Sequence, residues 1–372
     1  MEYIERRRLF KSQGKLAIAL YAMTESRNKG QFSKPPGNPE LVARITESIR
    51  AAGGRITFER FMEMALYHPG LGYYVNRPPI GQNGDFFTNV SVGDLYGRIL
   101  ARQFLRYRES LGNPPDFRVI EFGGHRGQLR DDVLREAPGL DYTVVEASGS
   151  PPEHITGCIF SNELLDAFPV HRVRVVNGQW QELYVTKGHE VDCSFMEIPG
   201  ELSTPLLTER LEGLPAHLME GYTTEINLRA MNWIREIARR LDQGYVVTVD
   251  YGHDRDGYFA PHRRDGTLLC HYQHTANRDP FARIGQQDIT AHVEFTSVME
   301  AGRQVGLETV MFCDQSQFLL ECGKDLLEEI TTRDAGRWSP DRNRLHQLIH
   351  PTLMGHTFKV LVQRKDCVHS GT

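Results

Sequence analysis

Carboxylate and amide side chains follow short apolar segments at three places in this chain. They are Glu121, Glu146 and the group formed by Asn162, Glu163 and Asp166. Open α/β sheets bind ligands outside the carboxyl ends of their strands, so side chains at such positions can meet at one edge of a sheet. Oxygen atoms grouped there could hold ribose hydroxyls or orient a cationic nitrogen.

A glycine-rich turn accompanies the first of these positions, in the segment FRVIEFGGHRGQL over residues 117–129. Gly123, Gly124 and Gly127 permit a tight turn between a buried strand and a helix. Such a turn lets the backbone approach a ligand closely and directs helix N–H groups at it, as in nucleotide-binding α/β proteins. A G-x-G-x-G pattern would have glycine at His125, and a purely structural turn is the alternative interpretation.

Glu146 lies 19 residues after Gly127. This is near the spacing at which nucleotide-binding folds use an acid to hold ribose hydroxyls. The alternative is an exposed acid at the end of a strand.

The segment SNELLDAF places Glu163 and Asp166 three positions apart. On a helical turn they would share a face and could bind one cationic group, whereas a helix cap or a solvated face is the alternative. Asp250 ends another expected strand. His292, in ITAHVEF, could act as a base or a donor to a substrate, with a satisfied structural histidine as the alternative.

Alternating strands and helices must position these residues. The apolar patterns predict strands over 117–122, 142–146, 158–162, 245–250 and 358–362. Strands that alternate with helices predict a parallel sheet covered on both faces, the α/β class.

An insertion interrupts this alternation. Asn177-Gly178, between alternating segments, predicts a β-hairpin. The apolar stripe that follows predicts a helix over Thr223–Leu241.

The chain divides into three regions by composition. Residues 1–40 are expected to form a basic N-terminal arm, and 41–112 a helical region in which Thr57 caps the second helix and a glycine- and aromatic-rich loop follows. Residues 113–372 are expected to form the core, with the insertion at about 170–235.

Composition excludes several classes. With 372 residues, 40% hydrophobic and 24% charged, the chain has the usage of a globular protein. A net charge of −5 gives no reason to expect nucleic-acid binding. No apolar run approaches the roughly 18 residues that a membrane span needs.

Cysteine usage and the N-terminus predict the compartment. Six cysteines without a C-x-x-C pair favour a reducing, bacterial-type cytoplasm, and no metal site is expected because the cysteine at 270 lacks a second ligand cluster. Acidic residues beside Arg6, Arg7 and Arg8 disfavour a mitochondrial presequence, and there is no signal-peptide core.

In order along the chain, seven segments resemble the MidA-like family of class I S-adenosylmethionine methyltransferases, which includes a mitochondrial arginine methyltransferase needed for assembly of respiratory complex I. They are ITFERFMEMALYHPGLGYY, GDFFTNVSVGDLYG, VIEFGGHRGQL, SNELLDAFPVHR, VVTVDYGH, QQDITAHVEF and FKVLVQRK. The resemblance does not cover residues 1 to about 40.

The resemblance implies a Rossmann-like class I methyltransferase sheet with an N-terminal helical region and an inserted β-hairpin and helical subdomain. The cofactor would be S-adenosylmethionine and the acceptor a protein arginine or a small molecule, with a homodimer possible. The cofactor would be held by Gly84, Asp85, Phe86, Thr88, Glu121, Gly123, Gly124, Gly127 and Glu146. Catalysis would fall to Asn162, Glu163, Asp166 and His292, with Glu163 the first choice for orienting the acceptor.

Two features depart from the family pattern. His125 replaces the middle glycine of the turn, where a left-handed conformation would cost about 1–2 kcal/mol. Glu146 and Ser161 are only 15 positions apart, too few for the helix and strand that the family places there and that contribute to the adenine pocket. Three functions therefore stay open: an active methyltransferase with an altered cofactor pocket, a non-catalytic binding or assembly module, and a protein acting on another small ligand.

Overall fold

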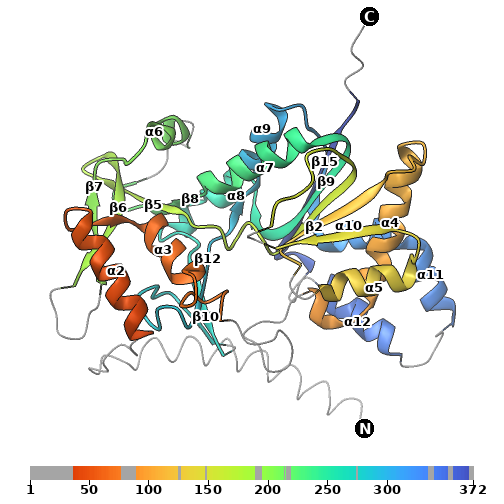
Figure 1. Cartoon of the computed structure of the whole chain (residues 1–372), viewed down its shortest axis with the longest axis horizontal. Helices are drawn as coiled ribbons and strands as arrows, with labels where there is room; N and C mark the ends of the chain where they lie inside the picture. Colours follow the sequence, from red (N-terminus) through yellow and green to blue (C-terminus); the bar gives the residue numbers. More distant parts are fainter. Residues whose placement is uncertain are drawn as a thin grey trace, which may run out of the picture.

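A seven-stranded sheet forms the centre of the computed structural model, on the right in Figure 1. Its strands are β14 (Glu308–Asp314), β15 (Phe358–Lys365), β9 (Leu241–His253), β4 (Ile155–Asn162), β2 (Arg118–Phe122) and β3 (Asp141–Val145), in that spatial order, with β13 (Val293–Glu294) beside β9. The structure describes residues 37–76, 89–124, 127–146, 149–188, 195–212, 214, 219–273, 275–333, 339–350 and 355–367.

The central strands run parallel, as the sequence predicts. β3, β2, β4 and β9 are mutually parallel. β15 runs antiparallel to β9, and β14 runs antiparallel to β15, so β14 has the direction of the central strands. From β2 the chain first adds β3 on one side and then β4 on the other, so the strand order reverses between β2 and β4. In open α/β sheets this reversal opens a crevice at the carboxyl ends of the two strands.

Helices cover both faces of this sheet because its strands are apolar on both sides. One face, with Val119 and Phe160, packs against α4 (Leu95–Ser110), α5 (Gln128–Glu136), α10 (Gln315–Cys322), α11 (Lys324–Arg333) and α12 (Pro340–Ile349). The other, with Ile120 and Ile159, packs against α7 (Leu228–Arg240) and α9 (Phe295–Arg303). The alternation of adjacent residues between the two faces is the period of two of a strand.

A second group of elements lies on the left in Figure 1. Its main sheet has the order β1 (Ile56–Thr57), β6 (Gln179–Lys187), β5 (His171–Val176) and β8 (Thr223–Ile226), with β7 (Phe195–Gly200) beside β6. A smaller sheet contains β11 (Thr275–Asn277), β10 (Leu269–Tyr272) and β12 (Asp288–Thr290). Helices α2 (Pro39–Ala51) and α3 (Phe58–Tyr67) share an apolar core with both sheets.

The described part of the chain also contains short helices that are not assigned to either group. They are α6 (Pro205–Glu212), α8 (Arg255–Tyr258), η1 (Asn89–Val92) and η3 (Pro261–Arg263).

Local sequence signals determine several of these elements. Thr57 caps α3, since its hydroxyl accepts a hydrogen bond from the backbone N–H of Arg60 at 3.1 Å. Asn177 (φ 53°) and Gly178 (φ 73°) form the turn between β5 and β6, because a two-residue hairpin of this type needs positive φ at both positions. Both predictions are confirmed.

The helix predicted over Thr223–Leu241 is wrong at its start. Thr223–Ile226 form β8, which pairs with β5 and is fully buried. Two threonines and an isoleucine favour an extended strand, and the neighbouring strand supplies the hydrogen bonds. Asn227 then caps α7 by accepting a hydrogen bond from the N–H of Ala230 at 2.8 Å.

The connection after β3 is as short as the sequence indicates. β3 ends at Val145 and β4 begins at Ile155, and β3 is the edge strand of the sheet.

Among the helices that the structure describes, none has the length and apolar character that crossing a membrane requires.

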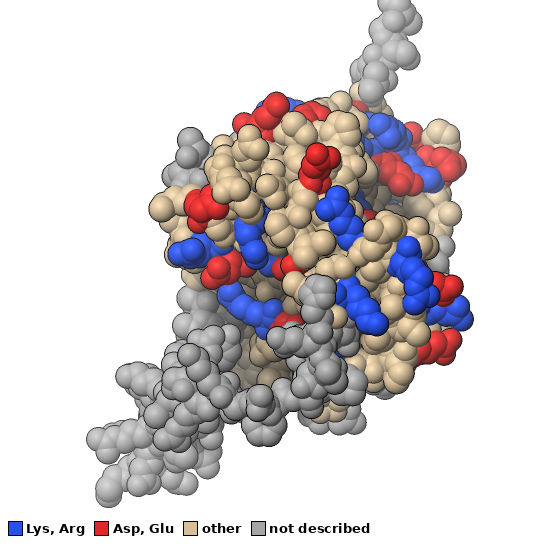
Figure 2. Space-filling view, turned by 90° about the vertical axis from the view of Figure 1, so that its left-hand side faces the viewer, with Lys and Arg blue, Asp and Glu red and all other residues tan. Residues whose placement is uncertain are grey.

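Charged residues on the second group of elements are interspersed. Figure 2 shows acidic and basic side chains side by side over this face, without one dominant sign. Arg229 on α7, for example, bonds to both Glu59 and Glu63 of α3. These pairs connect the second group to a helix that covers the central sheet.

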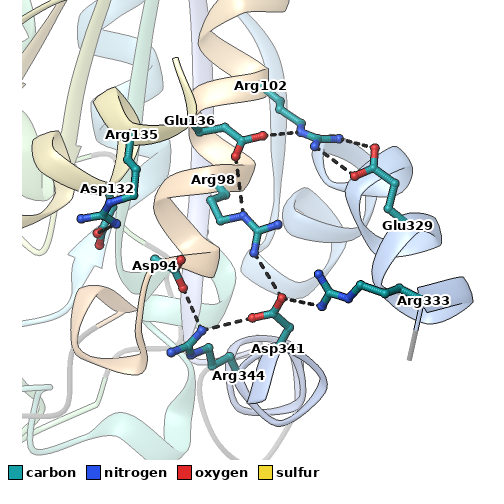
Figure 3. Close-up of polar contacts among 10 residues, drawn as sticks. All are labelled: Asp94, Arg98, Arg102, Asp132, Arg135, Glu136, Glu329, Arg333, Asp341 and Arg344. Carbon is teal, nitrogen blue, oxygen red and sulfur yellow. Dashed lines mark hydrogen bonds and ion pairs between the residues drawn. The ribbon is translucent and has the colours of Figure 1, made fainter. Parts of the chain in front are cut away.

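An ionic network joins the helices on one face of the central sheet (Figure 3). The Asp341 carboxylate of α12 forms ion pairs with Arg98, Arg333 and Arg344, at nitrogen–oxygen distances of 3.2, 3.0 and 3.1 Å. Burial raises the pKa of Asp341, but the hydrogen bonds from Arg333 and Arg98 outweigh burial and hold it below its usual value. The network thus fixes α12 against α4 and α11.

We expect Asp341→Asn to lower the free energy of unfolding by roughly 1–3 kcal/mol, because three charge-assisted contacts weaken at a mostly buried site. Urea denaturation at pH 7 measures this change. The difference should shrink below pH 4, since the carboxylate stabilises the fold above its unfolded pKa and loses this effect as it protonates. Glu329→Gln, whose side chain is 60% exposed, is the control and should change stability much less than Asp341→Asn; equal effects of the two variants would contradict the role of Asp341.

Candidate functional site

Six of the predicted residues lie at or just after the carboxyl ends of β2 and β4, the neighbouring strands between which the strand order reverses: Glu121, Gly123, Gly124, Gly127, Asn162 and Glu163. On the β2 side, Gly123 has φ 71° and donates its N–H to the carbonyl of Val145 at 2.9 Å. Gly127 has φ 70° and is the N-cap residue of α5. Because glycine has no side chain, it leaves the N–H groups of the first turn of α5 without a side-chain cap, and such groups attract anions.

Gly124 lies directly over the Glu121 carboxyl group. A Cβ atom at position 124 would lie 2.5 Å from Cδ of Glu121, closer than atoms pack. Glu121 is 3% exposed, and its Oε2 accepts a hydrogen bond from the Tyr142 hydroxyl at 3.0 Å. Burial raises the pKa of Glu121 to about 7, although the Tyr142 hydrogen bond works in the opposite direction.

On the β4 side, Asn162 and Glu163 are adjacent and joined. The Asn162 Nδ2 donates to Oε1 of Glu163 at 2.9 Å. Glu163 has φ 54°, a left-handed conformation that few non-glycine residues adopt. Strained residues that the surrounding structure holds in place often occur at functional sites.

The carboxylate of Asp250, at the end of β9, holds the segment after Glu163. Its Oδ2 accepts hydrogen bonds from the N–H groups of Leu164, Leu165 and Asp166 at 3.1, 2.8 and 3.3 Å. Its Oδ1 accepts from the N–H of Tyr251 at 2.8 Å. Burial raises the pKa of Asp250 to about 7, and the backbone donors counteract this rise.

The helical turn expected over Glu163 and Asp166 is wrong. The left-handed Glu163 and the backbone bonds to Asp250 bend the segment into an irregular turn instead. Asp166 is 6% exposed, and its pKa is raised well above the usual value by burial and by the charges of Asp250, Glu163 and Asp288. Asp166 thus lies near Glu163 but behind it, and its predicted catalytic role stays a prediction.

His292 lies near the same edge. Its Nδ1 is 3.2 Å from Nε2 of His253, and its ring stacks beside Tyr251 with centroids 6.3 Å apart. Burial, followed by the charge of Arg263, lowers the pKa of His292 to about 4, so the ring is neutral at neutral pH. A neutral imidazole could accept a proton, and the role of His292 as a base stays a prediction.

The other predicted residues divide between exposed and undescribed positions. Glu146 is exposed, directly after β3. The predicted positions Gly84, Asp85, Phe86 and Thr88, and the anomalous His125, lie outside the described residues. No group of histidine, cysteine, aspartate or glutamate suited to a metal ion occurs in the described parts of the chain.

Comparison with known proteins identifies the family. A family model described as "Putative S-adenosyl-L-methionine-dependent methyltransferase" matches residues 140–313. A COG1565 superfamily protein from Burkholderia thailandensis, solved with bound S-adenosyl-homocysteine, aligns over 90% of this chain and 96% of its own, with a TM-score of 0.81 and 32% identity. This chain belongs to the COG1565 superfamily of methyltransferases.

Curated relatives of this COG1565 protein are more distant. The Drosophila melanogaster "Protein arginine methyltransferase NDUFAF7 homolog, mitochondrial" is 24% identical over 384 residues, covering 87% of this chain and 85% of the fly protein. The Rattus norvegicus "Protein arginine methyltransferase NDUFAF7, mitochondrial" is 25% identical, covering 82% of this chain and 80% of the rat protein. The predicted family, fold class and enzyme class, an S-adenosylmethionine-dependent methyltransferase, are confirmed.

Four polar residues around the crevice of this methyltransferase were not predicted from its sequence. Tyr142 bonds to Glu121, and Asn89, Tyr96 and Gln315 form a buried group behind Asn162. Asn89 and Tyr96 belong to the matched segment GDFFTNVSVGDLYG, which was a usable signal. Gln315 lies in no matched segment and contacts Asn89 from 226 positions away.

Glu121→Gln should flatten the pH dependence of stability. The folded pKa of about 7 exceeds the usual 4.5, so the folded state binds more protons and stability falls as pH rises through this interval. Removing the titration should reduce the difference in unfolding free energy between pH 5 and pH 8 by on the order of 3 kcal/mol. Urea denaturation at both pH values measures it, and the exposed Glu153→Gln is the control. Parallel pH profiles for wild type and Glu121→Gln would refute the burial effect.

Proposed function

We propose that this COG1565 methyltransferase transfers a methyl group from S-adenosylmethionine to an arginine side chain of a protein. The observation that carries the proposal is the position of Glu163, held half-buried and left-handed directly after β4, the strand that pairs with β2 and its glycine turn. Two fixed sides of one crevice can hold a methyl donor and an acceptor together. The names of the curated relatives support arginine as the acceptor.

The β2 side fits the methionine end of the methyl donor. Gly123, Gly124 and Gly127 would let the backbone approach it, and the uncapped first turn of α5 would bind its carboxylate. Glu146 would hold the ribose hydroxyls, since it follows the strand next to β2. The assignments of Gly84, Asp85, Phe86 and Thr88 rest on the family resemblance alone.

The β4 side would hold the acceptor. S-adenosylmethionine, when bound, supplies a methyl group already activated by its sulfonium. The Glu163 carboxylate would orient a guanidinium nitrogen toward that methyl group and stabilise the positive charge that grows on the acceptor. As the N–CH3 bond formed, the S–CH3 bond would break, S-adenosylhomocysteine would leave, and the methylated nitrogen would release one proton to water. Asn162 would hold the Glu163 carboxylate in place through its Nδ2 hydrogen bond.

Binding of S-adenosylmethionine to purified protein, measured by calorimetry, tests the β2 side. Gly124→Ala should weaken binding at least about 10-fold, because its methyl group would displace the Glu121 carboxyl and the turn above it. Gly139→Ala is the matched control, since a Cβ there meets no atom within 4 Å. No binding to wild type at millimolar ligand, or equal binding by the two variants, would count against this site.

Methyl transfer from radiolabelled S-adenosylmethionine to cell extract tests the acceptor side. Glu163→Gln should lower the rate roughly 100-fold or more while S-adenosylmethionine binding changes less than about 2-fold, because the neutral amide no longer stabilises positive charge. The control is Glu209→Gln, an exposed carboxylate on α6.

The identity of the labelled product decides the acceptor. Acid hydrolysis of labelled protein should release methylarginine. Label in a small-molecule fraction, or full activity of Glu163→Gln, would overturn the proposal.

A further inference from the structure

A buried row of amides lies behind Asn162. Asn89 of η1 and Gln315 of α10 are both 0% exposed and exchange two hydrogen bonds. Asn89 Nδ2 donates to Gln315 Oε1 at 2.8 Å, and Gln315 Nε2 donates to Asn89 Oδ1 at 2.9 Å. Asn89 Nδ2 also donates to Oδ1 of Asn162 at 3.1 Å.

The hydrogen bonds along the row have a fixed donor-to-acceptor direction, because the row begins at a backbone carbonyl, which can only accept a hydrogen bond. Gln315 Nε2 donates to the backbone carbonyl of Leu348 at 3.3 Å, and a carbonyl has no hydrogen to give. This contact sets the orientation of the Gln315 amide. The Gln315 amide in turn fixes the orientation of the Asn89 amide, whose Nδ2 donates one hydrogen bond to Gln315 and one to Asn162.

Asn162 is the last amide of the row, and its orientation follows. Its Oδ1 accepts from Asn89 and from the Tyr96 hydroxyl at 3.0 Å. Its Nδ2 must therefore face the opposite way, where it donates to Glu163 at 2.9 Å. Reversing one amide would place like groups in contact and leave buried groups without hydrogen-bond partners, which is unfavourable.

We infer that Asn89 and Gln315 are positioning residues for methyl transfer. They act through Asn162, which they hold as a hydrogen-bond donor to the Glu163 carboxylate, and neither touches the crevice surface itself. A donor to a carboxylate favours its charged form, and the row holds such a donor at Glu163 in one orientation. The inference rests on the proposed role of Glu163 at the acceptor.

Other groups near Glu163 act on the same carboxylate. Tyr96 of α4, Tyr251 of β9 and Asp166 of the same turn each interact with its charge, and Asp250 lies beside Asp166. The charge of Asp166 opposes ionisation of Glu163, as like charges do. The Asn162 donor, held firmly at Glu163, acts against this repulsion.

Gln315→Met tests the inference with a matched control. Methionine keeps the volume of glutamine but removes both hydrogen-bonding groups. Gln363→Met is the control, because Gln363 on β15 is also 0% exposed and its amide atoms have no partner among the described residues. A general effect of burying methionine should appear in both variants.

We expect Gln315→Met to lower the rate of methyl transfer about 10-fold while S-adenosylmethionine affinity changes less than about 2-fold. The acid limb of its rate–pH profile should move to higher pH, since the carboxylate loses a fixed donor. Gln363→Met should match wild type in all three measurements. An unchanged rate and pH profile in Gln315→Met, or the same changes in both variants, would overturn the inference.

A spectroscopic measurement separates this inference from the proposed function. In protein labelled with 13C at the glutamate carboxyl, the Glu163 signal, assigned by its loss in Glu163→Gln, should titrate at higher pH in Gln315→Met. A shifted titration without methyl transfer to arginine keeps the positioning role and rejects the acceptor; an unshifted titration rejects the positioning role. If Gln315→Met fails to fold, Asn89→Leu, which is close to asparagine in size and adds no charge, removes the Asn89 Nδ2 donor to Asn162 and should give the same shift.

Discussion

The site depends on one carboxylate oxygen of Asp250, which accepts hydrogen bonds from three backbone N–H groups. Asp250 is 0% exposed, so its charge is costly unless donors surround it. Leu164, Leu165 and Asp166 supply these donors, and so the turn after β4 is held against the end of β9. The left-handed backbone at Glu163 is the point where the chain must bend to reach this arrangement.

The same edge of the sheet gathers several carboxyl groups whose charges oppose one another. Burial raises the pKa of Glu121, Asp250 and Asp166, and the charge of Glu163 adds to the rise at Asp166. An arriving cation would relieve this repulsion, whereas an anionic acceptor would increase it. This repulsion supports the proposed cationic acceptor on grounds separate from the names of the relatives.

Sequence reasoning succeeded where neighbouring residues determine the structure. The strands around Glu121 and Glu146, the Thr57 cap and the turn at Asn177 follow from local patterns. It failed at Thr223–Ile226, where pairing with β5 overrides the helical period, and after Glu163, where Asp250 supplies bonds from more than 80 positions away. The amide row could not be predicted, because its residues lie 73 and 226 positions apart and no local pattern relates them.

The short connection after β3 changes how the crevice can bind a nucleoside. Among the described residues β3 is the edge strand and Glu146 at its end is exposed, so no further described strand would shield a ribose or adenine bound there. In the proposed binding mode, less apolar surface would be buried on that side, which would reduce its share of the binding free energy. Most of the affinity would then come from the methionine side, at Gly123, Gly124 and the first turn of α5. This distribution suits methyl transfer, since the reaction requires alignment at the sulfonium and makes no chemical use of the adenine.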